Sequence, residues 1–231
     1  MITVRKSHER GHVNHGWLDT YHTFSFADYY DPNFMGHRAL RVINEDRVAP
    51  GKGFGRHPHR DMEIITYVLE GALEHADSMG NGSIIHAGNF QKMSAGTGIE
   101  HSEFNPSGDT PVHLYQIWIQ PGEKGLTPAY QELNAQAVAA SSQLRLIGTP
   151  DAGNGHIHIH QDVKLYLGRM KDGALTYSPV KGRHVWLQVT RGTVEVNGVT
   201  LHAGDGAAVE KEDVLNFTSV DSGEFLLFDL A

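Results

Sequence analysis

The chain of 231 residues contains no cysteine. This absence excludes disulfide bonds, thiolate-bound zinc, iron–sulfur clusters and a cysteine nucleophile. Any metal site must therefore be built from nitrogen and oxygen ligands. One such donor is plentiful, because the chain has 16 histidines, and imidazole both binds metals and titrates near neutral pH.

Basic character and long apolar runs are also lacking. Asp and Glu number 27 against 19 Lys and Arg, which gives a net charge of −8. We therefore expect no direct binding to nucleic acid, which depends on clustered Lys and Arg. No stretch approaches the ~20 apolar residues of a membrane helix, so no membrane partner is expected. Residues 1–10 lack the apolar core of a signal peptide, and the expected location is the cytoplasm.

Most of the chain is predicted to form β-strands. The candidates are short runs, rich in β-branched and aromatic residues and bounded by Gly, Pro, Asn or Asp. The clearest are residues 39–44, 64–69, 112–119, 185–189 and 225–229. Closely spaced strands of this kind indicate a β-sandwich or barrel. Residues 128–140 are the exception and are interpreted as a short helix or a linker.

A short motif occurs twice in the chain. Residues 81–88 are Asn-Gly-Ser-Ile-Ile-His-Ala-Gly, and residues 197–204 are Asn-Gly-Val-Thr-Leu-His-Ala-Gly. In each copy the Asn-Gly pair predicts a tight hairpin turn between two strands. The repeat predicts two β domains of similar fold, which we assign to residues 1–130 and 131–231.

The first domain contains histidines at metal-ligand spacing. His57 and His59 are two residues apart, which places both on one side of a strand, roughly 6.5–7 Å apart. His101 and Glu103 repeat this spacing. A sheet that folds back on itself can bring the pairs together as a site of three histidines and one glutamate, open to water or substrate. Glu63 has the same strand parity as His59, so the spacing leaves it as an alternative ligand or a supporting residue.

The second copy of the repeat is an internal control. It has no His-x-His where His57 and His59 would map, and the position of His101 falls near Phe217. Histidines that served only the shared fold should occur in both copies. We therefore expect a metal site in the first domain and none in the second. The run from His156 to His160, which alternates His and Ile, is interpreted as a polar strand face rather than a second site.

The residues around the first histidine pair match a known motif. Gly51, His57, His59 and Glu63 fit the first cupin motif, although seven residues rather than six precede Gly71. The motif combines turn glycines with ligands on adjoining strands. Its presence supports the metal interpretation.

The second cupin motif fits more loosely. Ser94 replaces its proline, and four residues rather than two separate Gly96 from His101. With these departures the chain resembles the pirin branch of the bicupins, and especially the bacterial pirin-like quercetin dioxygenases. The blocks that carry this resemblance include residues 23–32, 53–63 and 93–103.

The resemblance implies an all-β bicupin of two tandem antiparallel β-barrels of jelly-roll type. It implies that the N-terminal domain holds a divalent metal through His57, His59, His101 and Glu103, and that Glu103 is also the catalytic base. Fe(II) is the leading candidate, and Zn, Cu, Ni, Co or Mn also suit such donors. No residues for any further cofactor are expected.

The implied activity is a metal-dependent dioxygenase. Its small-molecule partners would be a quercetin-like flavonol and O2, and the heterocyclic ring would open with release of carbon monoxide. Pirins also resemble an iron-dependent, redox-sensing regulatory group, so the alternative is binding to a partner protein without turnover. A third reading is a sugar-processing cupin such as an isomerase. Turnover of a flavonol with oxygen separates the first reading from the other two.

Overall fold

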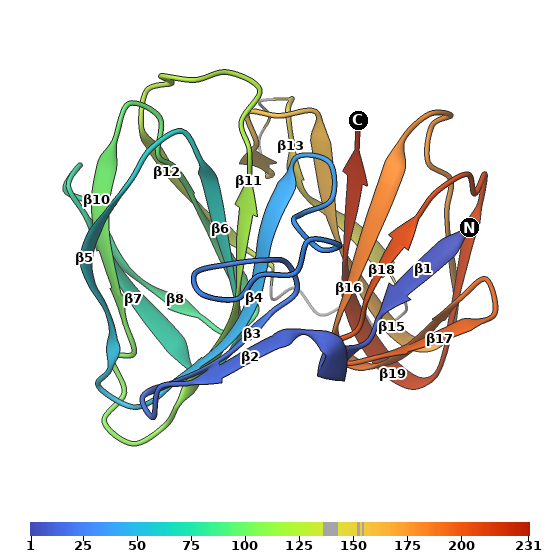
Figure 1. Cartoon of the computed structure of the whole chain (residues 1–231), viewed down its shortest axis with the longest axis horizontal. Coiled ribbons are helices and arrows are strands. Elements are labelled where there is room, and N and C mark those ends of the chain that lie inside the picture. The colour runs from blue at the N-terminus through green and yellow to red at the C-terminus, as the bar shows by residue number, and fades with distance from the viewer. Residues whose placement is uncertain (136–142, 152, 154) are drawn as a thin grey trace. The chain divides into compact units, whose positions relative to one another are not determined.

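The computed structural model describes residues 1–135, 143–151, 153 and 155–231, and these are almost entirely β-structure. Within them, the one helical element is the 3-10 turn η1 (Ser7–Glu9). The chain divides into two compact units, Gly11–Ala137 and Met1–Arg10 with Val138–Ala231. We call them the N-terminal barrel and the C-terminal barrel. The predicted all-β fold of two cupin-type barrels is confirmed (Figure 1).

The N-terminal barrel consists of two antiparallel sheets. The larger has the strand order β12-β9-β6-β11-β4-β3-β2, and the smaller has the order β5-β10-β7-β8. The strands are β2 (Gly11–Asn14), β3 (Leu18–His22), β4 (Leu40–Val48), β5 (Gly53–His59), β6 (Glu63–Glu70), β7 (Ala72–Asp77), β8 (Gly82–His86), β9 (Asn89–Ser94), β10 (Ile99–Phe104), β11 (Val112–Ile119) and β12 (Ala129–Asn134).

Apolar residues from both sheets pack together and fill part of the barrel interior. Each strand sends alternate side chains inward, and an apolar cluster forms from β3, β4, β6 and β11 on one side and β7 and β8 on the other. Its buried members are Leu18, Val48, Val68, Leu73, Ile85, Val112 and Leu114. Burying a side chain of this size stabilises the fold by about 1.5–3 kcal/mol. The cluster thus holds the two sheets together beside the polar interior described below.

The C-terminal barrel is built from one sheet. Its order is β1-β18-β16-β19-β15-β13-β14, with β17 added on β16. The strands are β1 (Ile2–Arg5), β13 (Gln143–Thr149), β14 (Ile157–His158), β15 (Val163–Tyr177), β16 (His184–Val196), β17 (Val199–His202), β18 (Gly206–Val209) and β19 (Leu215–Leu230). Register shifts interrupt the long strand pairs. Bulges of this kind bend strands, and the sheet encloses its own apolar core.

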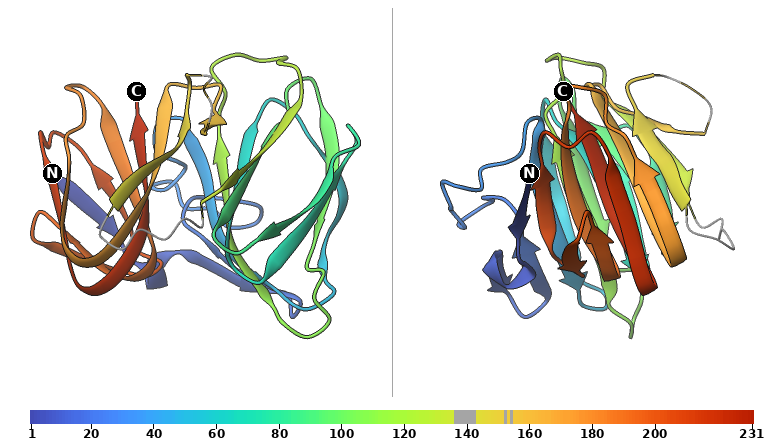
Figure 2. Two further views of the ribbon diagram at one scale, coloured as in Figure 1. Left: turned by 180° about the vertical axis from the view of Figure 1, so that it is seen from behind. Right: turned by 90° about the vertical axis from the view of Figure 1, so that its right-hand side faces the viewer.

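The first ten residues belong to the C-terminal barrel. Strand β1 pairs antiparallel with β18 over four residue pairs, and it lies alongside the C-terminal strands in Figure 2. At the other end of the N-terminal barrel, the expected boundary at residue 130 falls inside β12 (Ala129–Asn134).

Four of the five predicted strands lie within observed strands, and residues 112–119 coincide with β11. The fifth, residues 39–44, begins one residue before β4. The expected helix or linker at residues 128–140 is wrong for its first part, since β12 pairs with β9 there, and residues 136–140 lie outside the described residues. The two-residue turn is confirmed at Asn197 and Gly198, whose φ angles are 46° and 80°. Within the described residues, no helix has the length and apolar character needed to cross a bilayer.

Candidate metal centre

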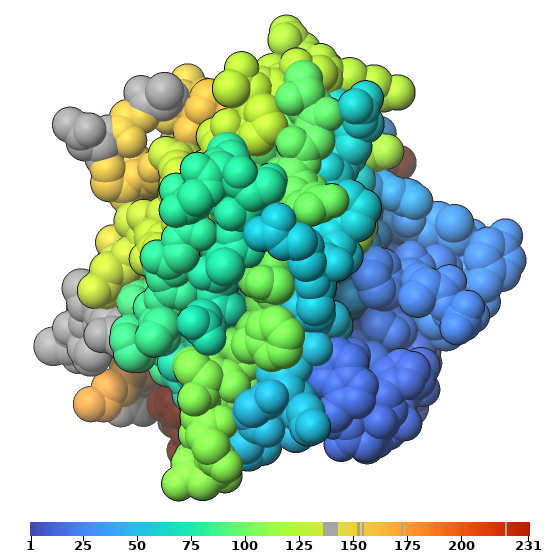
Figure 3. Space-filling model, turned by 90° about the vertical axis from the view of Figure 1, so that its left-hand side faces the viewer, coloured from blue at the N-terminus to red at the C-terminus, as the bar shows by residue number. Residues whose placement is uncertain are grey.

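Strands β5 and β10 carry the predicted ligands and pair with each other. Their antiparallel register places His57 directly opposite His101, and the two strands lie side by side at the surface in Figure 3. β5 is the edge strand of its sheet, which is where Pro58 can be accommodated without loss of a ladder hydrogen bond. Gly53 is needed for the close approach, because a Cβ there would lie 2.1 Å from the Glu103 carbonyl oxygen.

Three of the four predicted ligands converge in one cluster. One ring nitrogen from each of His57, His59 and His101 lies within 4.8 Å of the others. The Nε2 atoms of His57 and His101 are 3.1 Å apart. Two side chains from one strand and one from its neighbour thus meet as the spacing predicted.

The protonation of these rings suits a cation. The Nδ1–H of His57 donates to the Gly55 carbonyl over 2.8 Å, which leaves the Nε2 lone pair facing His101. Burial, and then the charges of neighbouring imidazoles, lower the pKa of His101 to about 3. Burial and the charge of His57 lower the pKa of His59 to about 4. Neutral imidazoles with converging lone pairs are the form that binds metals, so these residues fit a divalent ion.

Glu103 lies beside this cluster in the barrel interior. One of its oxygens, with ring nitrogens of His75 and His101, forms a second group of candidate ligand atoms within 4.8 Å of one another. The Gln91 amide donates to Glu103 Oε1 over 2.5 Å, and the Gln116 amide donates to Oε2 over 2.6 Å. A carboxylate has about four lone-pair sites, so Glu103 keeps acceptor capacity for an ion or a proton.

Burial dominates the electrostatics of Glu103. It raises the pKa of this carboxyl to about 7, and the Asp46 charge acts in the same direction, while hydrogen bonds from Thr66, Gln116 and Gln91 oppose the change. A cation beside Glu103 would stabilise its charged form. The hydrogen bonds from Gln91 and Gln116 hold the Glu103 side chain in place without an ion.

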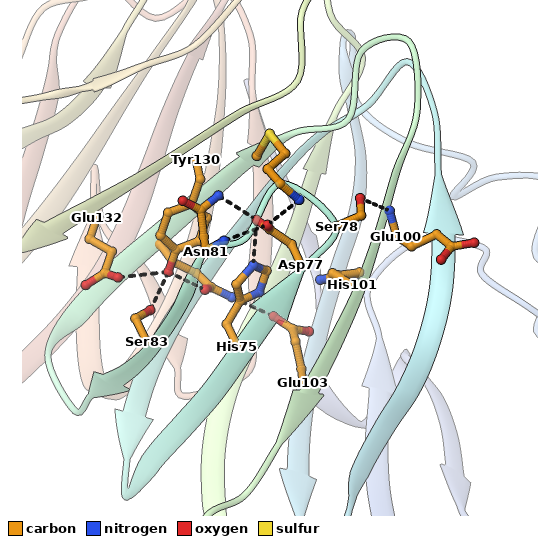
Figure 4. Close-up of polar contacts among 12 residues, drawn as sticks. His75, Asp77, Ser78, Asn81, Ser83, Glu100, His101, Glu103, Tyr130 and Glu132 are labelled. Carbon is orange, nitrogen blue, oxygen red and sulfur yellow. Dashed lines mark hydrogen bonds and ion pairs between the residues drawn. The ribbon is translucent and has the colours of Figure 1, made fainter.

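His75 is a site residue that sequence reasoning missed. Its side chain is fully buried on β7, where it is the cross-strand neighbour of Glu103. Its ring stacks on Tyr130 at a centroid distance of 4.8 Å, and its Nε2 lies 3.3 Å from Asp77 Oδ2 (Figure 4). His75 and Asp77 repeat the two-residue spacing of the other pairs, which is the one signal that could have found them.

Glu63, the alternative ligand, has a different partner. Its Oε2 lies 2.7 Å from Nζ of Lys92, and both side chains are only 1% exposed. Among the described residues, neither group of candidate ligands includes Glu63. Its strand parity with His59 does not bring it to the cluster, because the chain turns between β5 and β6 and Asp61 adopts a positive φ of 49° there.

A pocket opens onto the histidine cluster. Its cavity volume is about 160 Å³. One wall carries His57, His59, His101 and Glu103. Apolar and aromatic side chains form a second wall, and polar side chains of β3, β4 and β11 form a third; the apolar residues are Leu18, Phe26, Phe54, Ile64 and Trp118.

The histidine run of the C-terminal barrel alternates in burial, although only Ile157–His158 of it form a strand, β14. Ile157 and Ile159 are buried, whereas His156, His158 and His160 are half-buried. The described part of this barrel contains no group of three candidate ligands of the kind found around His101. Phe217, near the position that the repeat assigns to His101, is instead fully buried in the apolar core.

Comparison with known proteins agrees with this geometry. Residues 3–119 match the Pirin family, and residues 146–230 match the quercetinase C-terminal cupin domain. The chain belongs to the pirin family. A pirin-family relative, quercetin 2,3-dioxygenase of Escherichia coli (strain K12), is 53% identical over 231 residues, covering 100% of this chain and 99% of the relative.

Solved pirin structures are equally similar. The crystal structure of YhhW from Escherichia coli has a TM-score of 0.96 at 53% identity, covering 100% of this chain and 98% of that one. The structure of bacterial pirin YhhW from Escherichia coli in complex with nickel(II) has a TM-score of 0.94 at 52% identity, covering 100% and 99%. A pirin of nearly the same fold thus binds a divalent metal.

Proposed function

We propose that the N-terminal barrel is the active site of a metal-dependent dioxygenase that cleaves the heterocyclic ring of quercetin-like flavonols. The observation that carries this proposal is the position of the three converging imidazoles and Glu103 on one wall of a pocket that also has an apolar wall and a polar wall. The activity named for the relative that is 53% identical supports the same reaction class.

The proposed ligands are His57, His59, His101 and Glu103. These four residues would hold a divalent ion, which would supply Lewis-acid and dioxygen-activating chemistry at the pocket wall. Fe(II) is the metal we propose, and Ni(II) is the alternative because a close relative is known in complex with it. We assign no metal to the C-terminal barrel.

The remaining roles belong to the protein's own side chains. Glu103 lines the pocket, and we assign it the role of base that takes the proton of the flavonol 3-hydroxyl at a carboxylate oxygen. Trp118 packs edge-on against both His59 and Phe26, at centroid distances of 5.0 and 5.4 Å. These aromatic surfaces exclude water and suit a planar ring system beside the histidines.

The reaction consumes one flavonol and one O2. The two carbon–carbon bonds flanking the carbon that carries the 3-hydroxyl break, and that carbon leaves as carbon monoxide with its own oxygen. The oxygen atoms of O2 become bonded to the two carbons left behind, which form an ester and a carboxylate. Atoms balance without a further reductant or oxidant.

The test is a flavonol assay in air with metal-loaded protein. Protein loaded with Fe(II) or Ni(II) should bleach the quercetin absorbance and release carbon monoxide. His57→Ala should lose both metal and turnover, while His86→Ala, an exposed histidine on β8, should keep them. Absence of quercetin loss with every metal tested would refute the proposal, as would full activity of His57→Ala.

A further inference from the structure

The polar wall of the pocket contains two buried acceptor oxygens without partners. It is built from cross-strand neighbours, since Thr20 faces Asp46 between β3 and β4, and Asn44 faces Gln116 between β4 and β11. In the described structure, Asp46 Oδ1 and Gln116 Oε1 are buried and accept no hydrogen bond. Both residues line the pocket that the histidines share.

The orientation of each group is fixed by its other contacts. Gln116 donates its amide N–H to Glu103 Oε2 over 2.6 Å, which leaves Oε1 as the acceptor without a partner. Thr20 hydrogen-bonds the Asp46 carboxyl, and burial raises the pKa of Asp46 to about 7 against the effect of that bond. Near neutral pH, Asp46 is therefore present both as a carboxylate and as a protonated carboxyl group. The carboxylate only accepts hydrogen bonds, whereas the protonated group can also donate one.

Buried acceptors of this kind are costly. An unsatisfied buried polar group destabilises a protein by about 1–3 kcal/mol, and most such groups in folded proteins have a partner. The missing partners here are hydrogen-bond donors, and both residues line the pocket that a ligand would enter. A ligand that offers hydroxyl groups supplies such donors, whereas an apolar ring of the same size does not.

We propose that Asp46 and Gln116 form a hydroxyl-binding subsite that selects polyhydroxylated aromatic ligands over ligands with the same rings but without those hydroxyls. The use of flavonols as ligands rests on the proposed function. Asp46 is the specificity-determining residue of the pair, because Gln116 also holds Glu103. This assigns the polar wall to recognition and the histidine wall to chemistry.

The experiment compares the binding of two flavonols under nitrogen, where no turnover occurs. Quercetin and 3-hydroxyflavone share the ring that carries the 3-hydroxyl, but only quercetin has hydroxyls elsewhere. Calorimetry with Ni(II)-loaded protein should give a preference for quercetin that falls about tenfold in Asp46→Leu. Asp46→Asn retains an acceptor oxygen and should keep more of the preference. Asp19→Leu is the matched control, because Asp19 lies on β3 next to Thr20, pairs with His12 and does not line the pocket.

If Asp46→Leu keeps the same affinity ratio of quercetin to 3-hydroxyflavone, the proposal is overturned. Asp46 would then bind no hydroxyl of the ligand, and an ordered water would be its partner instead. If Asp46→Leu does not fold, the wild-type protein still tests the proposal. Equal affinity of the wild type for quercetin and 3-hydroxyflavone would also overturn the hydroxyl-binding subsite. A separate arm in air keeps the two proposals apart. Selective binding without quercetin consumption contradicts the dioxygenase but supports the subsite.

Discussion

Gln91 donates its side-chain amide to Oε1 of Glu103 over 2.5 Å inside the N-terminal barrel. The other end of the same amide faces Tyr130, whose hydroxyl lies 3.1 Å from Gln91 Oε1. The same hydroxyl lies 2.9 Å from Glu132 Oε1 (Figure 4). The two acceptors of the Gln91 N–H groups, Glu103 and Thr66, set the orientation of the amide. Tyr130 supports this orientation when its single hydroxyl proton is donated to Gln91 Oε1 rather than to Glu132. A chain of polar contacts thus runs from the exposed Glu132 on β12 to the proposed metal ligand.

This arrangement predicts that Gln91→Met weakens metal binding without removing any ligand. Partners that orient a metal ligand typically contribute 10–100-fold to affinity, and we expect a loss of about that size. Titration of the protein with Ni(II) against a competing chelator measures it. Gln120→Met, an exposed position at the end of β11, should be neutral. Equal affinity of the two variants would contradict the orienting role.

The buried pair of Glu63 and Lys92 predicts strong coupling in stability. Lys92→Met removes the cation beside the buried Glu63 carboxylate, which should lower the free energy of unfolding by about 3–5 kcal/mol. The double variant Glu63→Gln with Lys92→Met should regain most of that loss. Urea unfolding measures all three variants, and additive effects would show that the pair is not coupled. The double variant should also bind metal like the wild type, which a ligand role for Glu63 would not allow.

Asp77 organises the turn that follows β7, the strand that carries His75. Its carboxylate accepts hydrogen bonds from the backbone N–H groups of Met79 and Asn81 and from the Asn81 side chain, at 2.9, 3.1 and 2.9 Å. Asp77→Ala leaves these donors without their acceptor and should destabilise the protein by about 2–3 kcal/mol. The exposed Asp28→Ala should change stability by less than about 0.5 kcal/mol. Thermal unfolding compares them, and similar midpoints would contradict this account.

The attachment of the N-terminal segment predicts a pH dependence of stability. Burial raises the pKa of Asp205, but hydrogen bonds from His202, Ser7 and Lys6 outweigh it and lower the pKa below its usual value. A lowered folded-state pKa stabilises the protein at pH above the unfolded value of about 3.9, and this contribution is lost as the pH falls through the folded value. Asp205→Asn should therefore be about 1–2 kcal/mol less stable than the wild type at pH 7.

The same difference should shrink towards zero at low pH, because the wild-type carboxylate is then protonated. Urea unfolding of both proteins between pH 7 and about pH 3 tests this. A constant difference across the range would show that the charge of Asp205 does not matter. The protection factors of the β1 amides against hydrogen exchange, which depend on the bonds from Lys6 and Ser7 to Asp205, would then also not change with pH.

Local signals predicted the fold well, and the exceptions have a physical cause. The Asn197–Gly198 turn follows from the φ angles that only a few residues adopt. The equivalent Asn81–Gly82 pair does not form the same turn. The backbone and side-chain amides of Asn81 donate to the Asp77 carboxylate, and the chain reverses over residues 78–81 instead. The repeated motif begins at Asn81 and does not include Asp77, so it could not reveal this hydrogen bond across the loop.

The residues of the candidate site also differ in how far the sequence could predict them. The convergence of His57, His59 and His101 could be predicted because two side chains on one strand are encoded by local spacing. Spacing alone left Glu63 and Glu103 as alternatives, and the choice of Glu103 came from the family resemblance. His75 could not be predicted, since only the pairing register of β7 with β10 makes it a neighbour of Glu103. The polar wall around Asp46 depends likewise on the registers of β3, β4 and β11.

Isotope labelling tests the central claim most directly. Metal-loaded protein is given quercetin under 18O2, and both the ring-opened product and the released gas are analysed by mass spectrometry. The account predicts one carbon monoxide per quercetin, unlabelled, and a product that carries two labelled oxygens, with neither formed by His101→Ala. Quercetin loss without carbon monoxide, or a product with fewer than two labelled oxygens, would contradict a dioxygenase at this site.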